Sequence, residues 1–253
     1  MSTAATLVHN TQAEWGRLWS VRSTWAFALA TAVGVLGIST LAASQSAATA
    51  PVGGSPWQLA GMILLPGLFG TLVLITVAAT ADHATGSIIP TLQWTPRRSI
   101  LLAVRTTLLA ATGTGLGVVL LIASSTAIWL FAPQLTYFSA SATDKLGAVA
   151  LVFVTTSLLA IGLSLAIRNT AGALVCVFAL VLVLPLFLQV LPFEWVTRLI
   201  EFLPGSAALY FLLGEGPGDT DMTATSSTLT LGAWTLGALL VGSWRLLSTD
   251  ADR

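Results

Sequence analysis

Charged side chains are scarce in this chain. Aspartate, glutamate, lysine and arginine make up only 8% of its 253 residues, whereas hydrophobic residues make up 55%. A soluble domain carries about 25% charged residues, so this composition excludes an ordinary water-facing surface and indicates that most of the surface faces lipid. Basic and acidic residues balance to a net charge of zero, which argues against a nucleic-acid partner.

The residue types that most catalytic and metal sites need are also rare. Cys176 is the only cysteine, which excludes an internal disulfide framework and a cysteine-based metal cluster. The two histidines, His9 and His83, are far apart, and the chain has no HExxH or CxxC motif. The only lysine, Lys145, does not belong to a GxxxxGK[ST] phosphate loop. We therefore expect no catalytic, cofactor or metal site in this chain, and a membrane-embedded enzyme is disfavoured.

Long apolar runs are what the chain has instead. A helix needs about 20 apolar residues to cross the hydrocarbon core of a bilayer, and six runs meet or approach this length. They predict an all-α integral membrane protein with one transmembrane domain over residues 1–253. The third run exceeds what a membrane requires, so that helix should tilt or extend into water. The predicted spans are Thr24–Ala43, Leu59–Thr80, Ile100–Phe131, Leu146–Ile167, Ala171–Val190 and Leu229–Leu247.

The distribution of positive charge predicts the orientation of these spans. Basic residues favour the cytosolic side, and an inside N-terminus gives the larger cytosolic share. We therefore expect a multi-pass protein of the inner (plasma) membrane with both termini in the cytoplasm. The cytosolic side then carries Arg17, Arg22, Arg97, Arg98, Arg105, Arg168, Arg245 and Arg253, and the outer side carries Lys145 and Arg198.

The first run has an alternative interpretation as a cleaved signal peptide, because small residues follow it. Its apolar part, Trp25–Leu41, is longer than the usual apolar region of about 7–15 residues. We therefore expect the first span to be retained.

An amphipathic segment precedes the first span. Trp15, Leu18 and Trp19 fall on one helical face, and Glu14 and Arg17 fall away from it. This pattern predicts a short helix in the plane of the membrane surface. Two roles stay open for it, a simple interfacial anchor and a docking element for a partner.

Two further patterns concern helix packing. Gly113 and Gly117 form a GxxxG motif, which favours close helix packing, more often within a chain than between subunits. The segment before the last span is apolar but repeatedly interrupted, so it predicts two short helices that enter the outer leaflet and return. An interfacial helix pair without a transport role is the alternative. Arg198 lies at pairing distance from two acids on the predicted helix. The residues that define this external pair are Glu194, Arg198, Glu201, Pro204 and Gly205.

The most polar stretch, Ala81–Arg98, lies between the second and third spans. Glycine and hydroxyl side chains can end one helix and start the next, so the stretch predicts a short helix parallel to the membrane on the cytosolic side. Asp82 can be either a solvated charge at a helix end or a contact to a partner. Arg97 and Arg98 can bind lipid headgroups or a partner.

This stretch resembles the permease subunits of ABC transporters of the ABC-2 type. In that family an acid at the end of the second span is followed by a Gly-x-Ile pattern, a leucine, Pro-Arg-Arg and a basic residue within the third span. Ser87 stands where threonine or methionine is more usual, Asp82 where glutamate is commoner, and Arg105 where lysine is commoner. The matching residues are Asp82, Gly86, Ser87, Ile88, Leu92, Pro96, Arg97, Arg98 and Arg105.

The resemblance implies a division of labour between subunits. The cytosolic helix would be a coupling helix that contacts a separate ATPase subunit, and ATP and Mg would bind to that subunit. Two ATPases would pair with two permeases, identical or homologous, in an exporter of hydrophobic or amphipathic compounds such as drugs, peptides or lipid-like molecules. The coupling residues would be Asp82, His83, Thr85, Gly86, Ser87, Ile88, Leu92, Pro96, Arg97 and Arg98. The alternative is a self-contained channel or secondary carrier, against which the lack of charge at mid-membrane depth counts.

Overall fold

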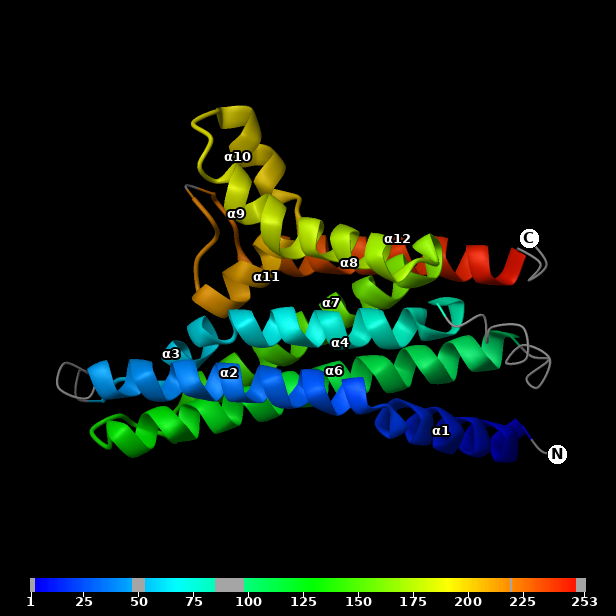
Figure 1. Cartoon of the computed structure of the whole chain (residues 1–253). Helices are drawn as coiled ribbons and strands as arrows, with labels where there is room; N and C mark the ends of the chain where they lie inside the picture. Colours follow the sequence, from blue (N-terminus) through cyan, green and yellow to red (C-terminus); the bar gives the residue numbers. More distant parts are fainter. Residues whose placement is uncertain (1–2, 47–52, 85–97, 219, 249–253) are drawn as a thin grey trace.

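The described part of the chain is helical and contains no strand (Figure 1). A computed structural model describes residues 3–46, 53–84, 98–218 and 220–248. Both chain termini lie at one end of the helical bundle, which we call the terminal end. The helices are α1 (Thr3–Ser20), α2 (Arg22–Ser46), α3 (Pro56–Ile63), α4 (Leu65–Ala84), α6 (Arg98–Phe131), α7 (Ala140–Ile167), α8 (Thr170–Phe178), the π-helical turn η1 (Ala179–Val183), α9 (Leu184–Leu188), α10 (Glu194–Glu201), α11 (Pro204–Leu213) and α12 (Ala224–Ser248).

Six helical segments are long and apolar enough to cross a membrane, as the sequence predicted. The third has 33 residues and is the longest. The fourth and sixth begin earlier than predicted, because their first turns continue through small and polar residues. These segments indicate a multi-pass membrane protein. They are Arg22–Gln45, Leu65–Asp82, Ser99–Phe131, Ala140–Ile167, Thr170–Leu188 and Ala224–Leu246.

The second span differs from its predicted bounds because the helix breaks near its start. We expected one helix over Leu59–Thr80, but α3 ends at Ile63 and α4 begins at Leu65. Pro66 has no amide hydrogen to donate to the preceding turn, and its ring hinders a continuous helix. The Leu64 amide instead bonds to the Gly61 carbonyl at 3.2 Å in a tighter turn.

The fifth span contains a second irregularity. A π-helical turn, η1, lies between α8 and α9 and comes just before Pro185. Gly205, near the start of α11, packs against the Val181 carbonyl in this turn so closely that a Cβ atom would clash with it. The bent pair of α10 and α11, whose axes differ by 80°, is thereby fixed to the fifth span. The prediction of two short helices broken at Pro204 is confirmed as a fold; its position in a membrane stays a prediction.

Helices α4 and α7 form the centre of the bundle. More than half of the most apolar stretch of α4 is buried, and half of the most apolar stretch of α7 is buried. Helix α7 crosses α12 closely, because a Cβ atom at Gly162 would lie only 2.7 Å from the Ala238 carbonyl oxygen. Large apolar side chains on the outer helices are exposed instead. On α2, Leu29, Val33 and Leu41 are each more than 60% exposed. Such exposure is unfavourable in water and favourable in lipid, which agrees with the membrane assignment.

The GxxxG motif packs within the chain. A Cβ atom at Gly113 would lie 3.3 Å from the Ser157 Cβ, and one at Gly117 would lie 2.7 Å from Cδ2 of Phe153, both on α7. Gly115, between them, faces open space. The motif therefore serves the α6–α7 contact, as the sequence favoured.

We expect Gly117→Ala to destabilise the fold and Gly115→Ala not to. The added methyl at position 117 forces the buried Phe153 ring to move, which costs about 1–3 kcal/mol. At position 115 alanine meets no neighbour and gains roughly 0.5–1 kcal/mol of helix propensity. The free energy of unfolding in mixed detergent micelles distinguishes the two. Equal effects of both substitutions would contradict the packing described.

Candidate functional site

Three helices bring charged side chains together at the terminal end of the bundle. Asp82 lies in the last turn of α4, and the chain then enters the segment 85–97. Arg105 lies two turns into α6, where the chain has returned from that segment. Arg17 lies in the last turn of α1, just before the bend that leads into α2. The three helices therefore meet at the two helix ends that flank residues 85–97 in the sequence.

The carboxylate of Asp82 is the centre of this cluster. Its side chain is completely buried. Arg105 Nη1 bonds to Asp82 Oδ2 at 2.5 Å, and Arg105 Nη2 donates to the Ala78 carbonyl at 2.8 Å. Arg17 forms an ion pair with Asp82 Oδ1, and Glu14 lies 3.6 Å from Arg17. We call Glu14, Arg17, Asp82 and Arg105 the ion cluster.

Charge balance explains why the cluster has this composition. A buried carboxylate loses its hydration, so it requires close cations and hydrogen-bond donors. Two arginines and two acids bring the formal charge of the ion cluster to zero. Burial lowers the pKa of Arg17 below its ordinary value, repulsion from Arg105 lowers it further, and Glu14 opposes these effects. An arginine remains protonated near neutral pH, so its pairing with Asp82 persists there.

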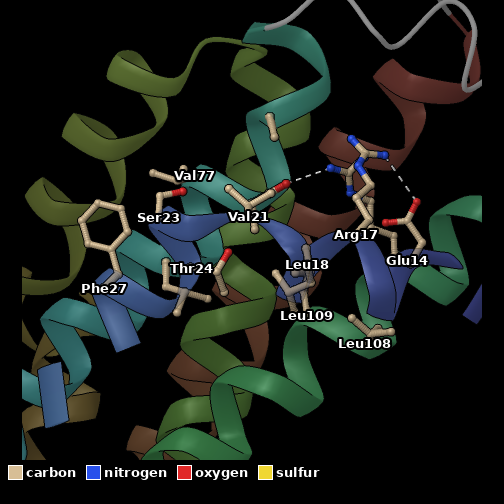
Figure 2. Close-up of a pocket in the computed structure, with 14 residues that line it drawn as sticks. Glu14, Arg17, Leu18, Val21, Ser23, Thr24, Phe27, Val77, Leu108 and Leu109 are labelled. Carbon is tan, nitrogen blue, oxygen red and sulfur yellow. Dashed lines mark hydrogen bonds and ion pairs between the residues drawn. The ribbon is translucent and has the colours of Figure 1, made fainter. Parts of the chain in front are cut away.

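A small crevice opens beside the ion cluster (Figure 2). It encloses about 70 Å³ and lies between α1, α2, α4 and α6. Figure 2 shows Arg17 and Glu14 directed toward one another at its edge. Most of its wall is apolar, including Leu18, Phe27 and Val77. The crevice is thus too small for a drug-sized ligand, which usually occupies about 300–1,000 Å³, and the cluster acts within the chain.

The structure distinguishes between the two roles that the sequence left open for Asp82. Its burial excludes a solvated charge at a helix end, because the carboxylate faces Arg17 and Arg105. A role in contact with a partner stays a prediction. The structure describes less of the other predicted coupling residues. His83 lies in α4 and Arg98 begins α6, but their side chains are outside the described part of the chain. Thr85, Gly86, Ser87, Ile88, Leu92, Pro96 and Arg97 lie outside the described residues altogether.

The predicted N-terminal helix is present and is longer than predicted, because α1 starts at Thr3; its place at the membrane surface stays a prediction. Leu18 is buried, and the Trp19 ring lies 5.6 Å from Trp15 and 4.8 Å from Trp25 between centroids. The sequence placed Arg17 away from the apolar face of the helix and indicated no partner for it. In the structure Arg17 reaches Asp82. A buried carboxylate requires close cations, and α1 supplies the second one.

The acidic and basic residues of the bent helix pair do not behave as predicted. Glu194 and Arg198 are exposed, and Arg198 forms no ion pair with Glu194 or Glu201 in the described structure. Exposed pairs are worth little because both side chains stay hydrated. Glu201 instead accepts a hydrogen bond from the Asp221 amide at 3.2 Å.

Sequence reasoning missed the residue that holds this pair in place. Lys145 Nζ donates to the carbonyls of Phe211 and Leu212 at 3.1 and 2.8 Å. These carbonyls belong to the last turn of α11, where carbonyls lack partners within the helix. Gly61 leaves room for the lysine, since its Cβ atom would lie 2.8 Å from Lys145 Nζ. A lone lysine near the end of an apolar span was the available signal.

We expect Arg17→Gln to loosen α1 while leaving the six spans folded. The variant removes the tie between α1 and Asp82, and Arg17 is partly exposed, so the effect is modest: amide hydrogen exchange in residues 10–20 should accelerate about tenfold. Arg22→Gln removes an exposed arginine and serves as the control, for which we expect no change. Unchanged exchange in the Arg17 variant would contradict the proposed tie.

In comparisons with known proteins, the chain matches no protein-family model and no curated protein.

Proposed function

We propose that this chain is the membrane-spanning permease subunit of an ATP-binding cassette exporter of the ABC-2 type. Its six apolar helices and the resemblance of Asp82–Arg105 to that family support the proposal. The orientation that it adopts follows the basic residues, with both termini and the segment 85–97 in the cytosol and the bent pair of α10 and α11 near the outer surface.

The observation that carries the proposal is the ion cluster beside the segment 85–97. Asp82 joins α4, which leads into this segment, to α6, which leads out of it, and Arg17 adds α1. Both arginine contacts are buried or partly buried, so the three helix ends are held as one unit. A displacement of the segment by a cytosolic partner would therefore move three helices together. Coupling of ATP hydrolysis to transport requires such a mechanical link.

The positions of the charges favour a partner that supplies energy. Within the described candidate spans, every acidic or basic side chain lies among the first or last seven residues of its span. Carriers driven by protons or sodium usually place an ionisable group near the bilayer midplane. A pathway without central charges also suits hydrophobic or amphipathic compounds better than ionic nutrients.

The partner can be identified by crosslinking from the segment itself. A photoreactive amino acid is placed at Ile88 or Leu92, and at the exposed Trp195 of α10 as the control, in cells that natively contain the protein. We expect positions 88 and 92 to crosslink to a polypeptide that contains a GxxxxGK[ST] phosphate loop, and position 195 not to do so. Crosslinks from all three positions to the same protein, or none to an ATPase, would contradict the proposal.

The self-contained channel or carrier is tested in vesicles. It predicts flux of a fluorescent amphipathic probe through vesicles that contain only this chain and no ATP. The exporter hypothesis predicts flux only with the ATPase and ATP present. Equal flux with the chain alone would reject the exporter.

A further inference from the structure

A second pair of arginines lies where α7 ends and α12 approaches its own end. Arg168 follows the last residue of α7 in a left-handed conformation with φ 58°. Its Nη2 donates to the Arg245 carbonyl on α12 at 2.6 Å, and Arg245 Nη1 donates to the Ala166 carbonyl on α7. Each arginine thus bonds to the helix of the other, which holds both guanidinium groups at the α7–α12 crossing.

These two positive charges have no acidic partner in the described part of the chain. The ion pairs there involve only Arg17 and Arg105 among the basic residues. Burial lowers the pKa of Arg168 below its ordinary value, and repulsion from Arg245 lowers it further. The Arg168 Nε atom is buried and has no hydrogen-bond partner. An unsatisfied donor beside two like charges is unfavourable and would be relieved by an anion.

An apolar groove begins at this arginine pair. It runs between α7 and α12, encloses about 420 Å³ and is lined by Leu163, Ala166, Trp234, Gly237 and Val241, among others. Ala166 belongs to both features, because it lines the groove and its carbonyl accepts the Arg245 bond. No atom lies within 4 Å of where a Cβ at Gly237 would be, so the groove is open there.

The distance from the arginines to the groove lining suits a lipid chain. Trp234, whose Nε1 donates to the Phe202 carbonyl at 2.7 Å, lines the groove. Arg245 follows Trp234 by eleven positions on α12, which corresponds to about 17 Å along a helix axis. Trp244, beside Arg245, is 71% exposed, as expected for a tryptophan at the level of lipid headgroups.

We propose that the α7–α12 groove binds an anionic phospholipid, with its phosphate between Arg168 and Arg245 and one acyl chain along Gly237 and Val241. Two guanidinium groups that have no acidic partner among the described residues match a phosphate, which arginine binds through several N–H donors. The adjoining apolar groove selects a phosphate that carries a hydrocarbon chain over a free anion. This site is independent of the exporter hypothesis, since it needs neither ATP nor a partner subunit.

The test is native mass spectrometry of the full chain, purified in detergent and titrated with phosphatidylglycerol or phosphatidylcholine. We expect the first phosphatidylglycerol to bind at least tenfold more tightly than phosphatidylcholine. Arg245→Gln should remove most of this preference, and Arg22→Gln, which removes an exposed arginine at the same end, should preserve it. Gly237→Leu should weaken binding of both lipids about tenfold by filling the groove, and since it projects into open space the chain should still fold.

Four outcomes would overturn the proposal. The first is equal affinity for the two lipids in the unmodified chain. The second is an equal loss with Arg22→Gln and Arg245→Gln, which would indicate a general effect of net charge. The third is displacement of phosphatidylglycerol by an equal concentration of inorganic phosphate, which would show that a free anion suffices. The fourth is unchanged binding in Gly237→Leu, which would show that the groove plays no part.

Discussion

Replacing Asp82 with asparagine is expected to lower the free energy of unfolding by about 3–5 kcal/mol, the usual cost of removing one partner from a buried ion pair. The substitution removes the carboxylate between Arg105, which is almost fully buried, and Arg17, and leaves only Glu14 to oppose their charges. Their mutual repulsion should also separate α1 from α6. Denaturant titration in mixed detergent micelles gives the change in free energy. No substitution among exposed residues should approach this effect.

Two comparisons make the Asp82 prediction specific. Asp144→Asn removes an exposed acid near the start of α7 and should change stability by less than about 0.5 kcal/mol. The double variant Asp82→Asn, Arg105→Gln should be less unstable than the sum of its single variants, because the two residues are in contact. Additive effects, or equal effects of the Asp82 and Asp144 substitutions, would contradict the geometry of the ion cluster.

Replacing Lys145 with methionine is expected to cost about 3 kcal/mol and to loosen the bent helix pair. Methionine keeps much of the length of the aliphatic stem but cannot donate to the Phe211 and Leu212 carbonyls. Each hydrogen bond from a charged group contributes roughly 1.5–3 kcal/mol, and the freed carbonyls have no partner within α11. Amide hydrogen exchange in α11 should accelerate at least tenfold, whereas exchange in α4 should not change.

The neighbouring residue again provides a control. Asp144→Asn, one position away in sequence, should leave exchange in α11 unchanged because its side chain is exposed. If Lys145→Met accelerated exchange throughout the bundle to the same extent, the lysine would be a general stabilising residue. Its assignment to the end of α11 would then be wrong.

The six spans could be predicted because lipid imposes a simple requirement. In a helix of about 20 apolar residues the backbone groups bond to one another and the side chains face lipid favourably. Each of the six runs contains a helical segment long and apolar enough to cross a membrane. The boundaries were less accurate where a local backbone effect intervenes. Pro66 separates α3 from α4 inside one apolar run. A hydropathy scale does not predict this break, because it takes no account of the amide hydrogen that proline lacks.

The ion cluster could be predicted only in part. The sequence singled out Asp82 and Arg105 separately, but residues 23 positions apart carry no signal that they bond. The sequence placed Arg17 away from the apolar face of its helix but indicated no partner, because helical periodicity gives the direction of a side chain and not which residue of another helix it meets. The sequence showed only that Lys145 does not belong to a phosphate-loop motif. Its partners in the structure are backbone carbonyls. Every residue has a backbone carbonyl, so no sequence pattern marks these partners.

The ion cluster and the α7–α12 arginine pair show two uses of arginine at the same end of the bundle. In the ion cluster the positive charges are balanced by Asp82 and Glu14 and fix helices to one another. At the crossing of α7 and α12 they bond only to carbonyls in the described structure. The first arrangement suits transmission of a displacement within the protein, and the second suits recognition of an external anion.

The most direct test of the proposed exporter is ATP hydrolysis by the complex that purifies through a tag on this chain from its native membrane. The account predicts magnesium-dependent hydrolysis, an at least tenfold loss when both Arg97 and Arg98 are replaced by glutamate, and no loss with the exposed control Arg22→Glu. A tagged chain that carries no ATP hydrolysis, yet alone mediates flux in vesicles, would contradict the account.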